Sequence, residues 1–286
     1  MTDPDIPEMT VNGLDLPRLA QGTWTLGDRQ CERLVRQGLD HGLRFFDTAE
    51  FYENERAVGR AIRQSGVDRQ SIRVATKIWD TQTSAARMIR NAEDCLQRLG
   101  LEYVDILYPH WYKTETSALE LAAAFQQLVD DGKIRAVGLS NFTPPMMERI
   151  YETGLSPIIC NQVEFHPYLK QEAIRSAVAE KGWAFLGYSP LAGGEVLKDP
   201  LINTLSEMYN KSPAQIVLRW ALEHEGLIPV VRMESESEIR ENVEAFSFDL
   251  RPEDTAQIDS LASRNVRFYE HPSMEGRWDA KAKLIP

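Results

Sequence analysis

The feature that most constrains this chain is the alternation of two sequence periods. Short runs rich in β-branched and aromatic residues are each followed by a stretch whose apolar residues recur every three or four positions, as in residues 85–99 and 118–129. Strands that alternate with helices form a parallel sheet, because each helix carries the chain back to start the next strand in the same direction. The eight predicted strands are residues 19–24, 45–49, 74–79, 104–110, 136–141, 158–164, 184–190 and 227–231.

Eight such units are the number that closes a (β/α)8 barrel, the TIM barrel. Two open doubly wound sheets are the alternative α/β architecture, but no Gly-x-Gly-x-x-Gly turn follows the first predicted strand and no Ser/Gly-rich linker interrupts the series. We therefore predict one barrel domain over residues 1–286. Asn12 and Gly13, flanked by Val11 and Leu14, predict an N-terminal β-hairpin, which we expect to close one end of the barrel.

Charge and hydropathy limit the partners of the chain. It carries 32 Lys and Arg against 43 Asp and Glu, a net charge of −11, and has no basic run. A negative chain repels a phosphate backbone, so we expect no nucleic-acid partner. No apolar run approaches the roughly 20 residues of a membrane span, and residues 1–5 are acidic where a secretory leader is basic. We expect no membrane partner and a cytoplasmic location.

The three cysteines, Cys31, Cys95 and Cys160, lie far apart and include no Cys-x-x-Cys pair. Neither a disulfide framework nor a cysteine-based zinc site is indicated. We expect three small, buried thiols.

Four polar residues fall at or just after the carboxyl ends of predicted strands, where a parallel barrel builds its active site. They are Asp47, Tyr52, Lys77 and His110. A buried Lys77 needs an anionic partner such as Asp47, and we expect Tyr52 beside this ammonium to have a lowered pKa and to donate a proton near neutral pH. His110 would hydrogen-bond the same substrate oxygen as Tyr52 and polarise a carbonyl for attack.

No residue near these four stands out as the attacking nucleophile. The sequence shows no serine at a strand-to-helix elbow, no Cys and His pair, and no carboxylate pair flanking a bond. A hydride from a bound cofactor is one candidate for the missing reactant, and the residues alone do not identify it.

At these residues the sequence resembles the aldo-keto reductase family. Three segments are similar to its catalytic motifs: FDTAEFYENE (46–55, with Gly59 after it), ATKIW (75–79) and YPHW (108–111). Three more are similar to its cofactor cleft: GLSNF (138–142), NQVEFHP (161–167) and GYSPL (187–191). The resemblance covers nearly the whole chain.

The resemblance implies reduction of an aldehyde or ketone by NADPH, with hydride passing to the carbonyl carbon, and alcohol oxidation in reverse. It implies that Tyr52 supplies the proton and that Lys77 and Asp47 adjust the acidity of Tyr52. His110 is the fourth catalytic residue that it implies. It also implies a set of cofactor contacts: Ser140, Asn141 and Gln162 on the carboxamide, Tyr188 on the nicotinamide ring, and Ser189 and Leu191 near the pyrophosphate.

The chain departs from the family pattern after the last strand. Many members have Lys-Ser, and then Arg before Ile-x-Glu-Asn, to clamp the adenosine 2′-phosphate, whereas residues 231–242 here read VRMESESEIREN. Arg232 replaces the lysine, but Glu238 stands at the arginine position, where it would repel a phosphate or accept a ribose hydroxyl. The contacts implied at this end are Arg232, Glu238, Glu241 and Asn242. On Arg232, Arg240 and the family habit we expect NADPH ahead of NADH, with NADH as the alternative.

The substrate end of the site is expected to be aromatic. The residues that fall there are Trp24, Phe51, Trp79 and Trp111. Such a pocket favours a small-molecule carbonyl on an apolar or aromatic body, and we expect residues 267–278 to cover it. Glu50 adds a hydroxyl acceptor, which keeps sugars among the candidates.

Three other functions stay open on the sequence: a dehydrogenase working mainly in the alcohol-oxidising direction, a cofactor-binding regulatory or redox-sensing barrel with little turnover, and metal-assisted hydrolysis. The last would use Asp47, Glu50, His110 and His166 as ligands. These lack two close His and a carboxylate at a recognised spacing, so we expect no metal. We expect His166 to support its own loop, and the protein to be a monomer.

Overall fold

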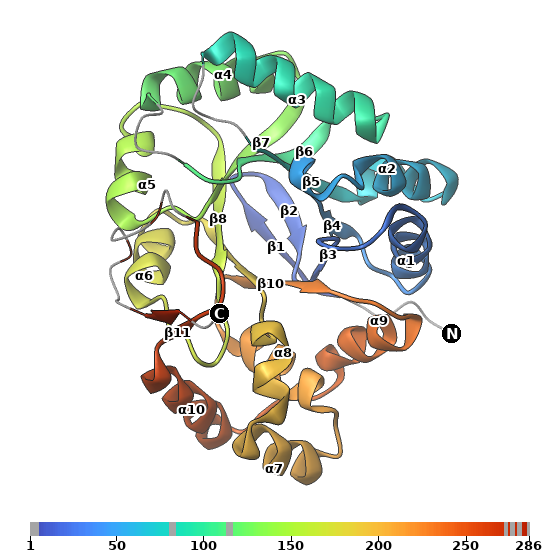
Figure 1. Ribbon diagram of the computed structural model, residues 1–286, viewed down its shortest axis with the longest axis vertical. Helices are drawn as coiled ribbons and strands as arrows, with labels where there is room; N and C mark the ends of the chain where they lie inside the picture. The colour runs from blue at the N-terminus through green and yellow to red at the C-terminus, as the bar shows by residue number, and fades with distance from the viewer. Residues whose placement is uncertain are drawn as a thin grey trace.

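Eight parallel strands close into a barrel in the computed structural model, which describes residues 6–79, 84–112, 117–271, 274, 278 and 282–284. Neighbouring strands follow the chain order, and the last strand pairs with the first (Figure 1). The strands are β3 (Ala20–Gly22), β4 (Phe45–Asp47), β5 (Arg73–Ile78), β6 (Val104–Pro109), β7 (Ile134–Ser140), β8 (Ile158–Glu164), β9 (Ala184–Tyr188) and β10 (Leu227–Arg232). The predicted (β/α)8 barrel is confirmed.

Helices surround the barrel (Figure 1) and pack their apolar faces on the strands in one hydrophobic layer. They are α1 (Asp28–Asp40), α2 (Glu55–Gln64), α3 (Ala85–Leu99), α4 (Ala118–Asp130), α5 (Pro144–Tyr151), α6 (Glu172–Glu180), α7 (Pro200–Tyr209), α8 (Pro213–Glu223), α9 (Glu236–Val243) and α10 (Pro252–Ser260). Local sequence sets where these helices begin, as the capping box at the start of α8 illustrates. The backbone N–H of Gln215 donates to Ser212 Oγ (3.3 Å), and the backbone N–H of Ser212 donates to Gln215 Oε1 (3.0 Å).

The remaining elements are short. They are the strands β1 (Glu8–Val11), β2 (Leu14–Pro17), β11 (Val266–Arg267) and β12 (Lys283–Leu284), and the 3-10 segments η1 (Glu50–Tyr52), η2 (Arg69–Ser71), η3 (Ala192–Lys198), η4 (Glu244–Ser247) and η5 (Leu261–Arg264). Of these, η1 and η3 lie at the carboxyl end of the barrel and contribute residues to the site described below.

The hairpin of β1 and β2 closes the amino end of the barrel, as predicted. Its turn residues Asn12 and Gly13 both have positive φ, 47° and 83°, which the tight hairpin turn requires. Val11 and Leu16 are buried in the cluster that fills the barrel interior. The Asn12 side chain donates to the carbonyl of Ile158, the first residue of β8 (2.8 Å).

Six of the eight predicted strands are one or two residues too long at the opposite, carboxyl end, whereas β8 ends at Glu164 as predicted and β10 extends one residue further, to Arg232. The strand predicted at 45–49 ends at Asp47, and the strand predicted at 184–190 ends at Tyr188. The backbone leaves the sheet there, and Ser189 takes a left-handed conformation with φ of 55°. The first residues after β4, Thr48 and Ala49, are still buried although they have left the sheet.

Two simpler expectations concern the cysteines and the membrane. Cys31, Cys95 and Cys160 are buried and unbridged, as expected. Among the described helices, none combines the length and the apolar character that a membrane span requires.

Candidate active site

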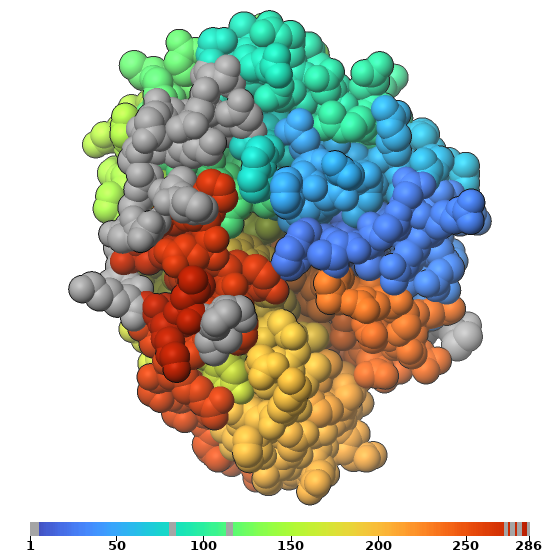
Figure 2. Space-filling view, viewed as in Figure 1, coloured from blue at the N-terminus to red at the C-terminus, as the bar shows by residue number. Residues whose placement is uncertain are grey.

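A cleft of about 510 Å³ opens at the carboxyl ends of the barrel strands. It is lined by nearly all the site residues that the sequence predicts: Trp24, Asp47, Phe51, Tyr52, Trp79, His110, Trp111, Ser140, Asn141, Gln162, Tyr188, Ser189, Leu191, Arg232, Glu238, Glu241 and Asn242. Lys77 is the exception, because it is buried next to Asp47 with only 1% of its surface exposed. The C-terminal segment, red in Figure 2, lies over this face and adds Tyr269 to the lining.

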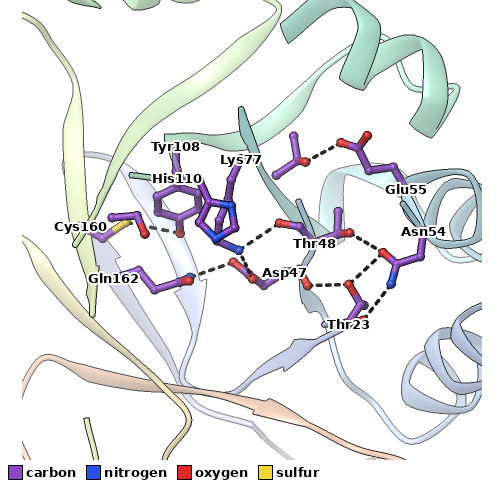
Figure 3. Close-up of polar contacts among 12 residues, drawn as sticks. Thr23, Asp47, Thr48, Asn54, Glu55, Lys77, Tyr108, His110, Cys160 and Gln162 are labelled. Atoms are coloured by element: carbon purple, nitrogen blue, oxygen red, sulfur yellow. Dashed lines mark hydrogen bonds and ion pairs between the residues drawn. The ribbon is translucent and has the colours of Figure 1, made fainter. Parts of the chain in front are cut away.

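Lys77 of β5 and Asp47 of β4 form a buried ion pair at the centre of the site (Figure 3). Lys77 Nζ also donates to the carbonyl of Thr48 (3.0 Å), and Gln162 Nε2 donates to the second carboxylate oxygen of Asp47 (2.8 Å). Burial lowers the pKa of Lys77, while the charge of Asp47 and its hydrogen bond raise it. The anionic partner predicted for Lys77 is therefore confirmed.

Tyr52 lies in η1, directly after the loop that leaves β4, with Lys77 Nζ 5.1 Å from its ring centroid. Burial raises the pKa of Tyr52 well above the usual 10.0, and the negative charge of Asp47 raises it further. The expectation that Lys77 lowers this pKa is wrong, because the Asp47 carboxylate contacts the ammonium and offsets its field at the phenol. Tyr52 is therefore protonated at neutral pH, which is the form that a proton donor needs.

His110 follows β6 and meets Tyr52 edge to face, with ring centroids 5.7 Å apart. Burial lowers the pKa of His110 well below the usual 6.5, and positive charge on Lys77 and His271 lowers it further. The imidazole is therefore neutral at pH 7 and keeps one N–H donor. Its Nδ1 is buried without a hydrogen-bond partner among the described residues.

Asn54 holds the segment that carries Tyr52, a role that the sequence did not reveal. Its side-chain oxygen accepts from the hydroxyls of Thr48 (2.8 Å) and Thr23 (3.3 Å). Its side-chain nitrogen donates to the carbonyls of Thr23 (2.8 Å) and Leu26 (3.1 Å), and Figure 3 shows Asn54 between these strand ends. The only signal in the sequence was an Asn just before a helix, which is also typical of an ordinary helix cap.

Glu50 has a role that the sequence did not predict. Its carboxylate accepts the backbone N–H of Trp79 (2.9 Å) and lies 3.9 Å from the guanidinium of Arg98. It is not among the described residues that line the cleft. The structure thus gives Glu50 a role in tying η1 to the end of β5, and its acceptance of a substrate hydroxyl stays a prediction.

The residues predicted to hold a cofactor extend the cleft from the buried centre to an exposed rim. Asn141, just after β7, accepts from the hydroxyl of Tyr188 (3.1 Å) and donates to the carbonyl of His110 (3.2 Å), so it joins the catalytic group to the cofactor side. Gly193 and Gly194 of η3 line the same cleft with positive φ, and the sequence did not single them out. Exposed residues of β10 and α9 complete the lining.

This lining fits an extended dinucleotide. Amide side chains and an aromatic ring lie near the protonated Tyr52 and the neutral His110, where a nicotinamide would react. The volume is that of a ligand pocket of ordinary size. The residues that would hold the nicotinamide end are Ser140, Asn141, Gln162 and Tyr188.

The four aromatic residues predicted for the substrate all line the cleft, and Phe51, Trp79 and Trp111 lie close together in it. Phe51 stacks on Trp79, with 4.3 Å between ring centroids and 17° between ring planes. His271 lies 5.2 Å from the ring of Trp111 and 5.7 Å from that of Trp79. Residues 267–278 are the predicted cover of this pocket. Of these, residues 272, 273 and 275–277 lie outside the described residues.

A buried carboxylate holds the C-terminal segment next to these aromatic residues. Glu164, the last residue of β8, accepts the backbone N–H groups of Phe268 (2.7 Å) and Tyr269 (3.1 Å). Tyr269 then packs edge to face on Trp24, with ring centroids 5.3 Å apart. His166 Nε2 lies 2.9 Å from Glu164, so His166 supports its loop, as expected.

The structure does not assemble the metal site considered for hydrolysis. His166 is bonded to Glu164 and Glu50 to the backbone of Trp79, so neither is free to join Asp47. No group of three or more His, Cys, Asp or Glu side chains within the described ranges is placed to hold a metal ion. The hydrolase alternative therefore lacks its ligand set.

Known proteins similar to this chain share one family. The aldo/keto reductase family model matches residues 18–263. The chain is 37% identical over 257 residues to a methylglyoxal reductase of Yersinia pestis, which covers 87% of this chain and 90% of the relative. It is 34% identical over 256 residues to a glyoxal reductase of Bacillus subtilis, with 87% and 90% covered. A solved structure, a Bombyx mori aldo-keto reductase in complex with NADP, matches with a TM-score of 0.82 and 27% identity over 89% of this chain and 92% of that one.

Proposed function

The chain belongs to the aldo/keto reductase family, and from this premise we propose that it reduces aldehyde and ketone carbonyls to alcohols with NAD(P)H, using Tyr52 as the proton donor. The observation that carries the proposal is the meeting of a protonated Tyr52, a neutral His110 and a buried Lys77–Asp47 pair at the end of one cleft.

Each of these residues has a separate part in the reaction. A bound NAD(P)H supplies the hydride to the carbonyl carbon. Tyr52 donates its hydroxyl proton to the carbonyl oxygen as negative charge develops there, and a neutral His110 donates a hydrogen bond to the same oxygen. Solvent then returns the proton to Tyr52, whose raised pKa favours the neutral phenol. Asp47 keeps the ammonium of Lys77 charged in its buried position beside the phenol. The hydride and the proton together complete the alcohol.

We propose small aldehydes as the substrates, including α-dicarbonyl compounds and flat aromatic aldehydes. Two relatives are named for methylglyoxal and glyoxal. The stacked Phe51 and Trp79 offer an apolar wall to a planar substrate body. In the alcohol-oxidising direction the same side chain would act as the base, in its phenolate form.

Replacement of Tyr52 by Phe tests the proposal directly. We expect Tyr52→Phe to lower kcat/KM for 4-nitrobenzaldehyde reduction by about 10²–10⁴-fold, because only the proton donor is removed. The affinity for the dinucleotide, measured by quenching of tryptophan fluorescence, should stay within about twofold. Tyr151→Phe is the matched control, since Tyr151 is 53% exposed and lies outside the cleft lining.

Two results would contradict the proposal. A Tyr52→Phe variant as active as the wild type would remove Tyr52 from its role. A wild-type protein that binds the dinucleotide but turns over no member of a broad carbonyl panel would favour the regulatory, redox-sensing alternative.

Several features that the sequence predicts accompany this function as proposals: one domain over residues 1–286, a cytoplasmic location and a monomeric state. The expected preference for NADPH is a separate question. The phosphate that distinguishes NADPH from NADH lies on the adenosine ribose, far along the molecule from the reacting carbon.

A further inference from the structure

The rim of the cleft formed by β10 and α9 is acidic. Its ionisable lining residues are Arg232, Glu234, Glu238 and Glu241, so three carboxylates face one guanidinium. Arg240, the second arginine on which an NADPH preference rested, is exposed on α9 and is absent from the described lining. The lining of this rim therefore has a net negative charge.

Arg232 is already engaged with its neighbours. Its Nη2 lies 2.6 Å from a carboxylate oxygen of Glu234, and its Nη1 donates to the hydroxyl of Thr25 (2.5 Å). A phosphate at this rim would have to compete with the Glu234 carboxylate for the guanidinium. Arg232 thus contributes less attraction for an anion than a free arginine would.

The start of α9 offers no compensating anion site. The backbone N–H of Glu238 donates to the hydroxyl of Ser235 (3.2 Å). The backbone N–H of Glu234 donates to the carboxylate of Glu238 (2.9 Å). The first turn of α9 also carries the carboxylates of Glu236 and Glu238. These negative charges occupy the end of the helix that would otherwise attract a phosphate.

We propose that Glu238 makes this rim select NADH over NADPH, in place of the preference expected from the sequence. The inference rests on the proposed function, in which the reacting ring lies at Tyr52 and the buried His110, and the exposed residues of β10 and α9 in the same cleft lining receive the adenosine end. A 2′-phosphate there would meet three carboxylates, whereas a free ribose offers hydroxyl donors that carboxylates accept. Glu238 is thus a specificity-determining residue for the cofactor.

Nucleotide fragments test this without catalysis. AMP and adenosine 2′,5′-bisphosphate differ only by the 2′-phosphate, and isothermal titration calorimetry gives both dissociation constants. We expect the wild-type protein to bind AMP about tenfold or more tightly than the bisphosphate at low salt. The ratio should shrink as ionic strength rises from about 0.01 M to about 0.1 M, because screening weakens charge repulsion. NADH and NADPH should show the same order by tryptophan fluorescence.

Two variants assign the effect to Glu238. Glu238→Gln keeps an acceptor for the Glu234 amide and removes only the charge, and we expect it to tighten bisphosphate binding about threefold. Glu238→Arg should tighten it about tenfold or more and reverse the preference. Glu253→Arg is the control, since it makes the same change in net charge on α10, where the Glu253 side chain is 62% exposed and outside the cleft lining.

The outcomes separate this inference from the proposed function. The role of Glu238 would be overturned if the wild type bound the bisphosphate more tightly than AMP. It would also be overturned if Glu238→Arg and Glu253→Arg changed the dissociation constant of the bisphosphate equally. Carbonyl reduction would stand in both cases. A protein that binds neither NADH nor NADPH would overturn both.

Discussion

At the scale of single residues, burial decides the protonation states in the cleft more strongly than the nearest charge does. Lys77 lies 5.1 Å from the Tyr52 ring, yet the pKa of Tyr52 is raised, because desolvation and the Asp47 carboxylate both favour the neutral phenol. Burial likewise keeps His110 neutral by lowering its pKa. The free protein therefore holds both groups in the forms that donate hydrogen bonds to a carbonyl oxygen.

These directions predict the pH dependence of the reduction. Tyr52 loses its proton only as the pH rises past its raised pKa, and His110 gains one only as the pH falls past its lowered pKa. We expect kcat/KM to change little between pH 6.5 and pH 10.0, the usual values for the two side chains. A steady-state profile at saturating cofactor measures this. A fall in kcat/KM centred well below pH 10.0 would instead support a phenol acidified by Lys77.

At the scale of elements, the cleft depends on contacts between segments far apart in the chain. Glu50 joins η1 to the end of β5, and Asn54 joins the residues after η1 to the loop after β3. Glu164 joins β8 to the C-terminal segment. Each contact uses a buried or half-buried polar side chain to satisfy backbone groups at a loop. The strands thus hold the catalytic residues, and these polar contacts hold the loops against them.

The contact of Glu164 with the C-terminal segment predicts a local effect of substitution. Glu164→Gln removes one acceptor oxygen and puts an N–H group next to a backbone N–H of Phe268 or Tyr269. We expect amide hydrogen exchange in residues 266–271 to speed up about tenfold, and KM for aromatic aldehydes to rise. Hydrogen-exchange mass spectrometry measures the first effect.

Glu172→Gln is the control for this substitution, since the Glu172 side chain is 72% exposed on α6. Unchanged exchange in Glu164→Gln would show that the Glu164 carboxylate is not what holds the segment.

At the scale of the whole molecule, the two ends of the barrel serve different purposes. The amino end is closed by the hairpin, whose Val11 and Leu16 pack with interior residues such as Phe45. The carboxyl end carries the cleft, where buried polar residues replace much of the apolar packing. Stability and chemistry are therefore separated along the barrel axis, as is typical of this fold.

A core substitution at the hairpin tests this separation. Leu16 is fully buried, and we expect Leu16→Ala to lower the free energy of unfolding by about 2–5 kcal/mol through lost burial and a residual cavity. Urea denaturation measures the loss. Leu119→Ala, at a residue that is 72% exposed, should change stability by less than about 0.5 kcal/mol. A large fall in kcat per folded molecule of Leu16→Ala would contradict the separation.

The amino-acid sequence by itself determined the barrel, the hairpin and the set of residues at the carboxyl ends of the strands. These follow from local properties: the alternation of periods, the Asn12-Gly13 turn, and the position of Asp47, Lys77 and His110 along their strands. The errors at strand ends have the same origin, since the local sequence does not reveal where backbone pairing with the neighbouring strands stops.

Only the tertiary structure decided what those residues do to one another. Gln162 donates to Asp47 across 115 positions of the chain, and Phe268 donates to Glu164 across 104. The raised pKa of Tyr52, the engagement of Glu50 and the pairing of Arg232 with Glu234 depend in the same way on burial and on which groups come into contact. Charge interactions and desolvation act through space, so spacing along the chain does not predict their sign.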